Sequence, residues 1–212
     1  MFNRFLFFSV IILLVWKADG AAGNQDGFAG VVTRVKGVVT ARKAGNETAL
    51  PLKAGDHITV GQIVVSSGDS GAQIVFSDDS FVNVLPATTL FITQYNYSKD
   101  TGRRTAVIKI IDGRVRLVLY KVRSSESRFV VETDHAIVTV GICDFFVNVS
   151  RSVTEILNLG APFSVKNVSP LVVGVVSLGP NQKTVLKEMK PPEQPVTVSP
   201  EQRRMYLKDA EI

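Results

Sequence analysis

Apolar and polar residues alternate with a period of two along most of the chain. The alternating runs are short, as residues 72–76, 81–85 and 136–140 illustrate. Gly, Asp, Asn, Ser or Pro stands at most of the breaks between runs, and these residues favour tight turns. Short alternating runs joined by tight turns are typical of half-buried antiparallel strands. The pattern therefore predicts an all-β fold, either an antiparallel β-sandwich or a β-roll of many short strands.

The C-terminal part of the chain departs from this pattern. Pro191 and Pro192 end the alternation, because proline cannot donate a hydrogen bond to a sheet. Ser199 followed by Pro200 is typical of a helix start, which predicts a short helix over residues 201–208. We expect a Pro-rich tail with a short C-terminal helix that is loosely attached to the β fold.

The N-terminal segment has the pattern of a secretory signal. Arg4 precedes an apolar run over residues 5–16, and small residues follow up to Ala22. The run is shorter than the ~20 residues of a membrane helix, so cleavage is expected and an uncleaved anchor is the alternative. The predicted parts are a signal peptide over residues 1–22, a β domain over 28–190 and a tail over 191–212. Export would place the protein in the periplasm or outside the cell.

Composition narrows the classes of function. The formal net charge is +5, with 24 Lys and Arg interspersed among 19 Asp and Glu. Nucleic-acid binding favours a denser basic patch, so no nucleic-acid partner is expected. Cys143 is the only cysteine, which excludes an intrachain disulfide. Because free cysteines are usually buried, we interpret it as a small core residue.

Three short motifs follow one another through the β region. The first contains Gly55, Asp56 and Gly61; the second is Phe76-Ser77-Asp78-Asp79-Ser80; the third contains Thr133, Ala136, Val140, Gly141 and Phe145. In this order and spacing they resemble the FecR-type domain, a periplasmic module of bacterial signalling and envelope proteins. The chain departs from the family pattern in the third motif. The family has Pro where Asp134 stands, and Arg-Gly-Thr in place of Gly141-Ile142-Cys143.

The resemblance implies a class of protein and a compartment, but no ligand and no cofactor. In the family's signalling members, a membrane helix joins this domain to a cytoplasmic segment that controls a sigma factor. Only residues 1–4 precede the apolar run here. We therefore expect the exported module alone and not a complete transmembrane regulator.

Candidate catalytic and metal-binding residues are few. His57 and His135 have no potential ligand at a metal-site spacing, so each is interpreted as a turn or surface residue. A nucleophilic pair of Cys143 and His135 would need an accessible, electropositive thiol, whereas Cys143 stands among apolar residues. Asp78 and Asp79 supply few of the oxygens that calcium needs and suit a hairpin turn. We expect no catalytic site, no metal and no cofactor.

Asp112-Gly113 is a strong signal for a two-residue hairpin turn. Such a turn would pair Lys109 with Arg116 and would place Lys109, Arg114 and Arg116 on one outer face. Like charges directly opposite each other are unfavourable, so something must offset them. Water, salt or a carboxylate from another strand is one answer. The other is an anionic partner, namely a phosphate-bearing lipid, an acidic glycan or an acidic protein patch.

The leading hypothesis is a non-enzymatic, exported FecR-like module for ligand or partner recognition in the bacterial envelope, linked to signal sensing. The alternative is a structural or surface protein that binds anionic glycan or lipid through the basic β face. A small exported enzyme ranks third. The expected partner is an unidentified protein or glycan of the envelope, with membrane attachment only through an uncleaved signal. The oligomeric state is left open.

Overall fold

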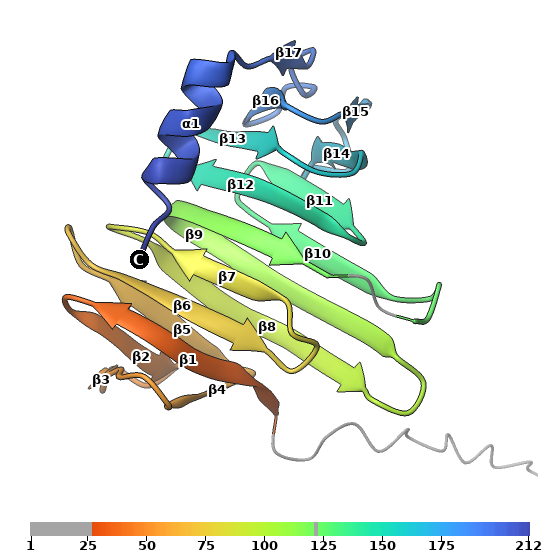
Figure 1. Cartoon of the computed structure of the whole chain (residues 1–212). Helices are drawn as coiled ribbons and strands as arrows, with labels where there is room; N and C mark the ends of the chain where they lie inside the picture. Colours follow the sequence, from red (N-terminus) through yellow and green to blue (C-terminus); the bar gives the residue numbers. More distant parts are fainter. Residues whose placement is uncertain (1–26, 121–122) are drawn as a thin grey trace, which may run out of the picture.

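The computed structural model describes residues 27–120 and 123–212. The chain forms two β-sheets that pack on each other, and a single described helix lies against one of them (Figure 1). The predicted all-β class with a short C-terminal helix is confirmed. The predicted signal peptide lies outside the described residues. Within the described ranges, no helix is long and apolar enough to cross a membrane.

Backbone pairing defines the two sheets, which we name A and B. The strands of sheet A, in spatial order, are β4 (His57–Thr59), β1 (Phe28–Lys36), β6 (Gly71–Phe76), β7 (Phe81–Val84), β9 (Arg103–Leu119), β12 (Cys143–Val149), β13 (Val153–Asn158), β16 (Gln182–Lys187) and β17 (Val196–Thr197). The strands of sheet B are β3 (Leu50–Pro51), β2 (Val39–Lys43), β5 (Gln62–Ser66), β8 (Thr89–Ser98), β9, β10 (Arg128–Glu132), β11 (Ala136–Val140), β14 (Phe163–Asn167) and β15 (Val175–Leu178). The pairing is antiparallel except between β9 and β10.

Strand β9 belongs to both sheets. Its first part pairs with β8 as far as Asp112, and its second part pairs with β12 from Gly113 onward. The predicted hairpin at Asp112-Gly113 is therefore wrong, since the chain continues through these residues from sheet B into sheet A. Gly113 has a φ of 87°, and a Cβ there would lie 2.4 Å from the Ala87 carbonyl oxygen. The glycine is needed for this crossing, as it would have been for a hairpin.

The crossing explains how both halves of β9 face one core. Ile108 and Ile110 are buried on the sheet B side, whereas Val115 and Leu117 are buried on the sheet A side. The buried positions change from even to odd numbers across residues 111–114, because the strand changes sheets there. All four belong to one apolar cluster that fills the space between the sheets.

The C-terminal helix α1 (Pro200–Lys208) begins as the sequence predicts. Ser199 caps it, and Ser199 and Gln202 form a reciprocal capping box. The expected loose attachment is wrong, because the segment packs on sheet A (Figure 1). Phe146 of β12 and Leu157 of β13 form a second apolar cluster there with Ala210. β17 also extends sheet A beyond residue 190.

Candidate functional site

The motif residues of the first half shape turns. Gly55 and Asp56 precede β4, where Asp56 Oδ2 accepts a hydrogen bond from the Lys53 backbone nitrogen at 2.8 Å. Gly61 connects β4 to β5 with a φ of 86°. Asp79, between β6 and β7, also has a positive φ and donates its backbone N–H to the Phe76 carbonyl. The predicted hairpin turn at residues 78–80 is thus confirmed.

The third motif forms a buried turn between β10 and β11. Thr133 Oγ1 accepts hydrogen bonds from the backbone nitrogens of His135 and Ala136 at 3.1 and 2.9 Å. Thr154 Oγ1 lies 2.8 Å from Thr133 Oγ1 and 3.2 Å from His135 Nδ1. His135 is a turn residue, as predicted, but it is buried and not on the surface.

Cys143 is buried at the start of β12, as predicted. Its thiol donates to Asn158 Oδ1 at 3.1 Å and lies 3.3 Å from the Ala161 carbonyl oxygen. Burial raises the pKa of the Cys143 thiol to about 12, so the thiol is protonated at neutral pH. His135 contacts Thr154 instead, which gives no support to a Cys143–His135 nucleophile pair.

The most unusual feature of the interior is a buried ion pair between Arg104 of β9 and Asp78 of the β6–β7 turn. Both side chains are 0% exposed. Arg104 Nη1 donates to Asp78 Oδ2 and also to Ser80 Oγ at 2.9 Å, and Nη2 donates to the Gly141 carbonyl at 2.7 Å. The guanidinium lies 5.3 Å from the centre of the Phe129 ring. One arginine therefore ties the turns of the second and third motifs to β9.

Tyr95 of β8 completes this buried cluster. Its hydroxyl donates to Asp78 Oδ1, and its ring stacks on Phe76 with centroids 4.6 Å apart. Burial raises the pKa of Tyr95 far above its usual value, and the Asp78 carboxylate raises it further. The phenol is thus a permanent donor to Asp78. The side chains of Arg104, Asp78 and Tyr95 are all buried, so we interpret the cluster as a structural clamp.

The three candidate cations do not share one face. Lys109 lies in the sheet B part of β9, between Phe91 and Glu132 on the neighbouring strands. Arg114 and Arg116 lie in the sheet A part. The expected pairing of Lys109 with Arg116 is wrong, because it depended on the hairpin.

Each of these cations has a carboxylate from another segment. Lys109 Nζ is 2.9 Å from Asp134 Oδ1, and Arg114 Nη1 is 3.3 Å from Asp209 Oδ2. Arg116 makes a two-pronged contact with Asp144 at 3.0 and 2.8 Å, and these hydrogen bonds raise its pKa. The repulsion that motivated an anionic partner is thus offset within the protein.

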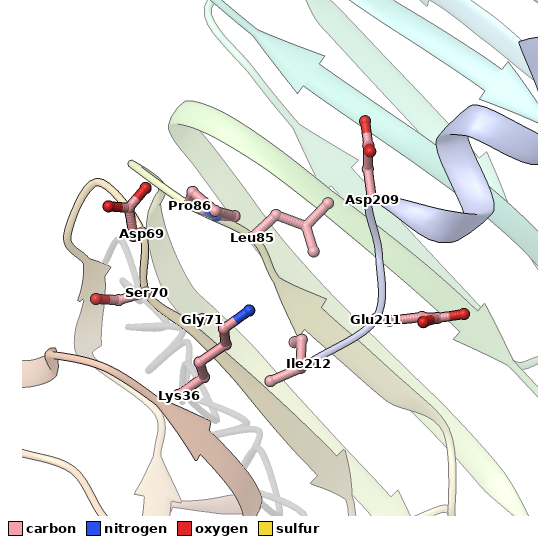
Figure 2. A pocket seen from close by; sticks show the side chains of 9 residues that line it. All are labelled: Lys36, Asp69, Ser70, Gly71, Leu85, Pro86, Asp209, Glu211 and Ile212. Carbon is pink, nitrogen blue, oxygen red and sulfur yellow. The ribbon is translucent and has the colours of Figure 1, made fainter.

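Small hollows surround the C-terminal segment where it crosses the outer side of sheet A. One, of about 80 Å³, is bordered by Lys36 of β1, Asp69 and Ser70 before β6, and Glu211 and Ile212 of the tail (Figure 2). Across the described residues, no group of three or more His, Cys, Asp or Glu side chains is placed to hold a metal ion.

One edge of sheet B carries exposed apolar residues. In the β14–β15 loop, Leu171 and Val173 are 79% and 88% exposed, and Val175 at the start of β15 is 64% exposed. We name these residues, with Val168, the apolar edge. Strand β15 pairs with β14, and no pairing on its other side is recorded among the described strands. The sequence alternation predicts a strand over residues 171–178, but only its second half forms one, and the alternation gives no sign of a sheet edge.

The base of this loop is fixed. Asn167 Nδ2 donates to the carbonyl oxygens of Lys187 and Lys190, both at 2.9 Å. Val168 N donates to the His135 carbonyl at 3.1 Å. The exposed apolar residues therefore project from an anchored loop.

Comparison with known proteins agrees with this architecture. Two crystal structures, at 1.65 and 2.50 Å, of a protein provisionally described as an anti-sigma factor from Parabacteroides distasonis ATCC 8503 share the fold. Their TM-scores are 0.53 and 0.52, each at 14% identity over 68% of this chain. The chain spans 64% and 63% of the length of those two chains. No curated protein sequence matches it.

Residues 62–159 match the model of the FecR protein family. The match includes Thr133, Ala136 and Gly141 of the third motif, whereas Gly55, Asp56 and Gly61 lie just before it. It extends from β5 to the end of β13 and contains the whole Arg104–Asp78 cluster. This part of the chain is therefore similar to the FecR family, as the order of its motifs predicted.

Proposed function

We propose that this protein is a non-enzymatic FecR-type module that recognises a protein partner in a bacterial envelope signalling assembly. The FecR match over residues 62–159 carries this proposal, because the resemblance to FecR-type domains implies an envelope signalling protein. The shared fold with the Parabacteroides distasonis protein, described as an anti-sigma factor, is consistent with a signalling role. Fold similarity alone does not assign a partner.

The apolar edge is the surface that best suits such a partner. Edge strands usually carry charged residues or proline, which disfavour pairing with another chain. Strand β15 has neither, since its sequence is Val175-Val176-Ser177-Leu178. An extended segment of another protein could pair with its free backbone groups, while Leu171 and Val173 offer apolar contacts. Since Asn167 holds the loop base, little ordering would be required on binding.

Site-specific photo-crosslinking in the native envelope tests this proposal. A photoreactive residue at Val173 should give a discrete protein adduct, which Leu171→Ser should weaken. Leu50 of β3, 65% exposed at the other edge of sheet B, is the matched control position and should give no such adduct. The same adducts from both positions, or none from Val173, would exclude the apolar edge as the recognition surface.

Export of the domain is part of the proposal. It rests on Arg4, the apolar run over residues 5–16 and the small residues up to Ala22. Protein isolated from the native host should begin near Ala21 or Gly23 by intact-mass measurement. Retention of Met1 in the membrane fraction would instead indicate an uncleaved anchor.

The basic-face alternative has less support. The geometry gives Lys109, Arg114 and Arg116 separate carboxylate partners on two sheets. Glutamates at positions 114 and 116 would face Asp209 and Asp144, so the double reversal should also lower stability.

A further inference from the structure

The C-terminal segment covers an apolar patch on the outer side of sheet A. In β12, Phe145 and Val147 point into the main core, whereas Phe146 between them belongs to the second cluster under the helix. Leu157 of β13 alternates in the same way with Ile156. Together with Leu85 these side chains are buried, and they form one cluster with Val198 and Ala210 of residues 198–212. We name residues 198–212 the strap and the surface below it the strap face.

The strap packs on the face but is less buried than the core strands. Helix α1 has no buried residue of its own, and only Val198 before it and Ala210 after it are buried. Asn83 Nδ2 donates to the Ala210 carbonyl at 2.9 Å, and the Tyr206 hydroxyl donates to Glu155. A segment with so little buried surface opens at lower free energy than the core strands. The capping box favours helix formation even when the strap is free.

The strap does not fill its groove. Hollows of about 300 and 390 Å³ flank it, one bordered by Tyr206 and Arg114 and the other by Phe81 and Arg116. The aromatic rings of Phe146 and Tyr206 lie 5.4 Å apart at its centre. The strap face is thus apolar in the middle, has unfilled space on both sides, and is bordered by arginine.

Charge also matches between strap and face. Asp209 contacts Arg114 on β9, and Glu211 borders the same hollow as Arg116. Lys36 borders the hollow that contains Asp209 and Glu211 (Figure 2). The face therefore suits a short helix with aromatic and aliphatic anchors followed by carboxylates, which is the chemistry of the strap itself.

We propose that the strap is an internal ligand that closes a peptide-binding face on sheet A, and that an amphipathic helix with an acidic C-terminal end, from a partner protein, displaces it. The partner helix lays its apolar side on Phe146 and Leu157 and its carboxylates against Arg114. The strap lowers the apparent affinity for the partner helix, because only molecules with an open strap can bind it. The face is separate from the apolar edge, so tests of the two surfaces are independent.

A labelled synthetic peptide of residues 198–212 tests the proposal on the full chain by fluorescence anisotropy. Ala210→Asp with Tyr206→Ser should open the strap without altering the face, since both residues belong to the strap. If the strap is closed at least about nine tenths of the time, this variant should bind the peptide at least about tenfold more tightly than the unaltered protein. Arg204→Ser, on the exposed side of α1, is the matched control and should bind like the unaltered protein. Circular dichroism should show the same β content in all variants.

A charge exchange tests the face itself. Arg114→Glu in the strap-opened protein should weaken peptide binding, and a peptide with Asp209→Arg should restore it. No binding to a folded strap-opened variant, or equal binding before and after opening, would refute the proposal. A dimer of the full chain with exchanged straps, and no peptide binding by the monomer, would also refute it in favour of a second copy as the occupant.

Discussion

Replacing Arg104 by methionine should strongly destabilise the fold, because it would leave Asp78 as an unpaired charge in the core. Asp78 would keep the hydroxyls of Tyr95 and Ser80 as donors but would lose the guanidinium. Breaking a buried pair by removing one partner costs about 3–5 kcal/mol. Since domains of this size shift by about 2–4 °C per kcal/mol, Tm should fall by roughly 6–20 °C.

Urea unfolding monitored by circular dichroism and calorimetry would measure this loss. Arg103→Met is a matched control one residue away, because Arg103 pairs with Glu126 at 3.5 Å in solvent. An exposed pair contributes about 0–1 kcal/mol, so this control should remain close to the unaltered protein. Adding Asp78→Asn to Arg104→Met should recover part of the loss, because no buried charge then remains.

Two results would refute the buried-clamp interpretation. Arg104→Met could unfold at the same urea concentration as Arg103→Met, which would mean that water reaches the pair. The effects of Arg104→Met and Asp78→Asn could also be strictly additive, whereas residues in contact should show a coupling energy of about 0.5–3 kcal/mol.

The remaining predictions concern the thiol, the strand crossing and the third motif. A thiol reagent should label Cys143 slowly in the folded protein and quickly in denaturant. Because the pKa of Cys143 is raised to about 12 in the folded protein, the buried thiol should stabilise the fold below pH 9, and this stabilisation should be lost as pH rises toward 12. Cys143→Ala should reduce this dependence of the unfolding free energy on pH. Gly113→Ala should cost about 1–3 kcal/mol or more in urea unfolding, and Gly45→Ala, which has a similar positive φ but open space, should cost less. Val140→Asp should lower the free energy of unfolding by several kcal/mol in the same assay, because it would bury a charge. Ile142→Asp is the control and should be nearly neutral, because Ile142 is half-exposed in the adjoining turn. An unchanged Tm for Val140→Asp would contradict the strand register.

The alternation of apolar residues predicted which side of each strand is buried. A period of two places Val138, Val140, Phe145, Val147 and Val149 on the core side of their strands, and all are buried. Such a prediction succeeds because a strand has only two faces, so the period of two assigns the side chains directly. The partner of each strand is a long-range property, and the alternation carries no information about it.

Asp112-Gly113 shows the limit of a local signal. Both a hairpin and a strand that crosses between sheets need a positive φ at this glycine, and both reverse the phase of the alternation. Pairing with distant residues decides between them, since Gly113 lies opposite Val149 of β12. The error over Lys109, Arg114 and Arg116 follows directly from this ambiguity.

The position of Arg104 in the alternation of β9 indicates burial, although Arg104 is absent from the candidate residues of the sequence analysis. It shares its parity with Ala106, Ile108 and Ile110, all of which are buried, whereas Arg103 has the opposite parity and is exposed. A cation in register with a core face predicts a buried partner. The identity of that partner, Asp78, could not be predicted, because a loop and two strands separate the residues in the chain. The packing of the strap could not be predicted from the pattern of its helix, because its buried residues, Val198 and Ala210, lie outside the helix.

The departure of this chain from the FecR motif affects its surface more than its fold. Gly141 is exposed with open space around its Cβ position, so the family's arginine would fit there and point outward. Ile142 occupies the family's glycine position without a positive φ, and the Cys143 thiol makes the hydrogen bond to Asn158 that a threonine hydroxyl could make. The inward-facing Gly141 carbonyl still accepts from Arg104. The turn therefore keeps its structural contacts without the arginine of the family motif. The partners proposed above would instead bind at the apolar edge and the strap face.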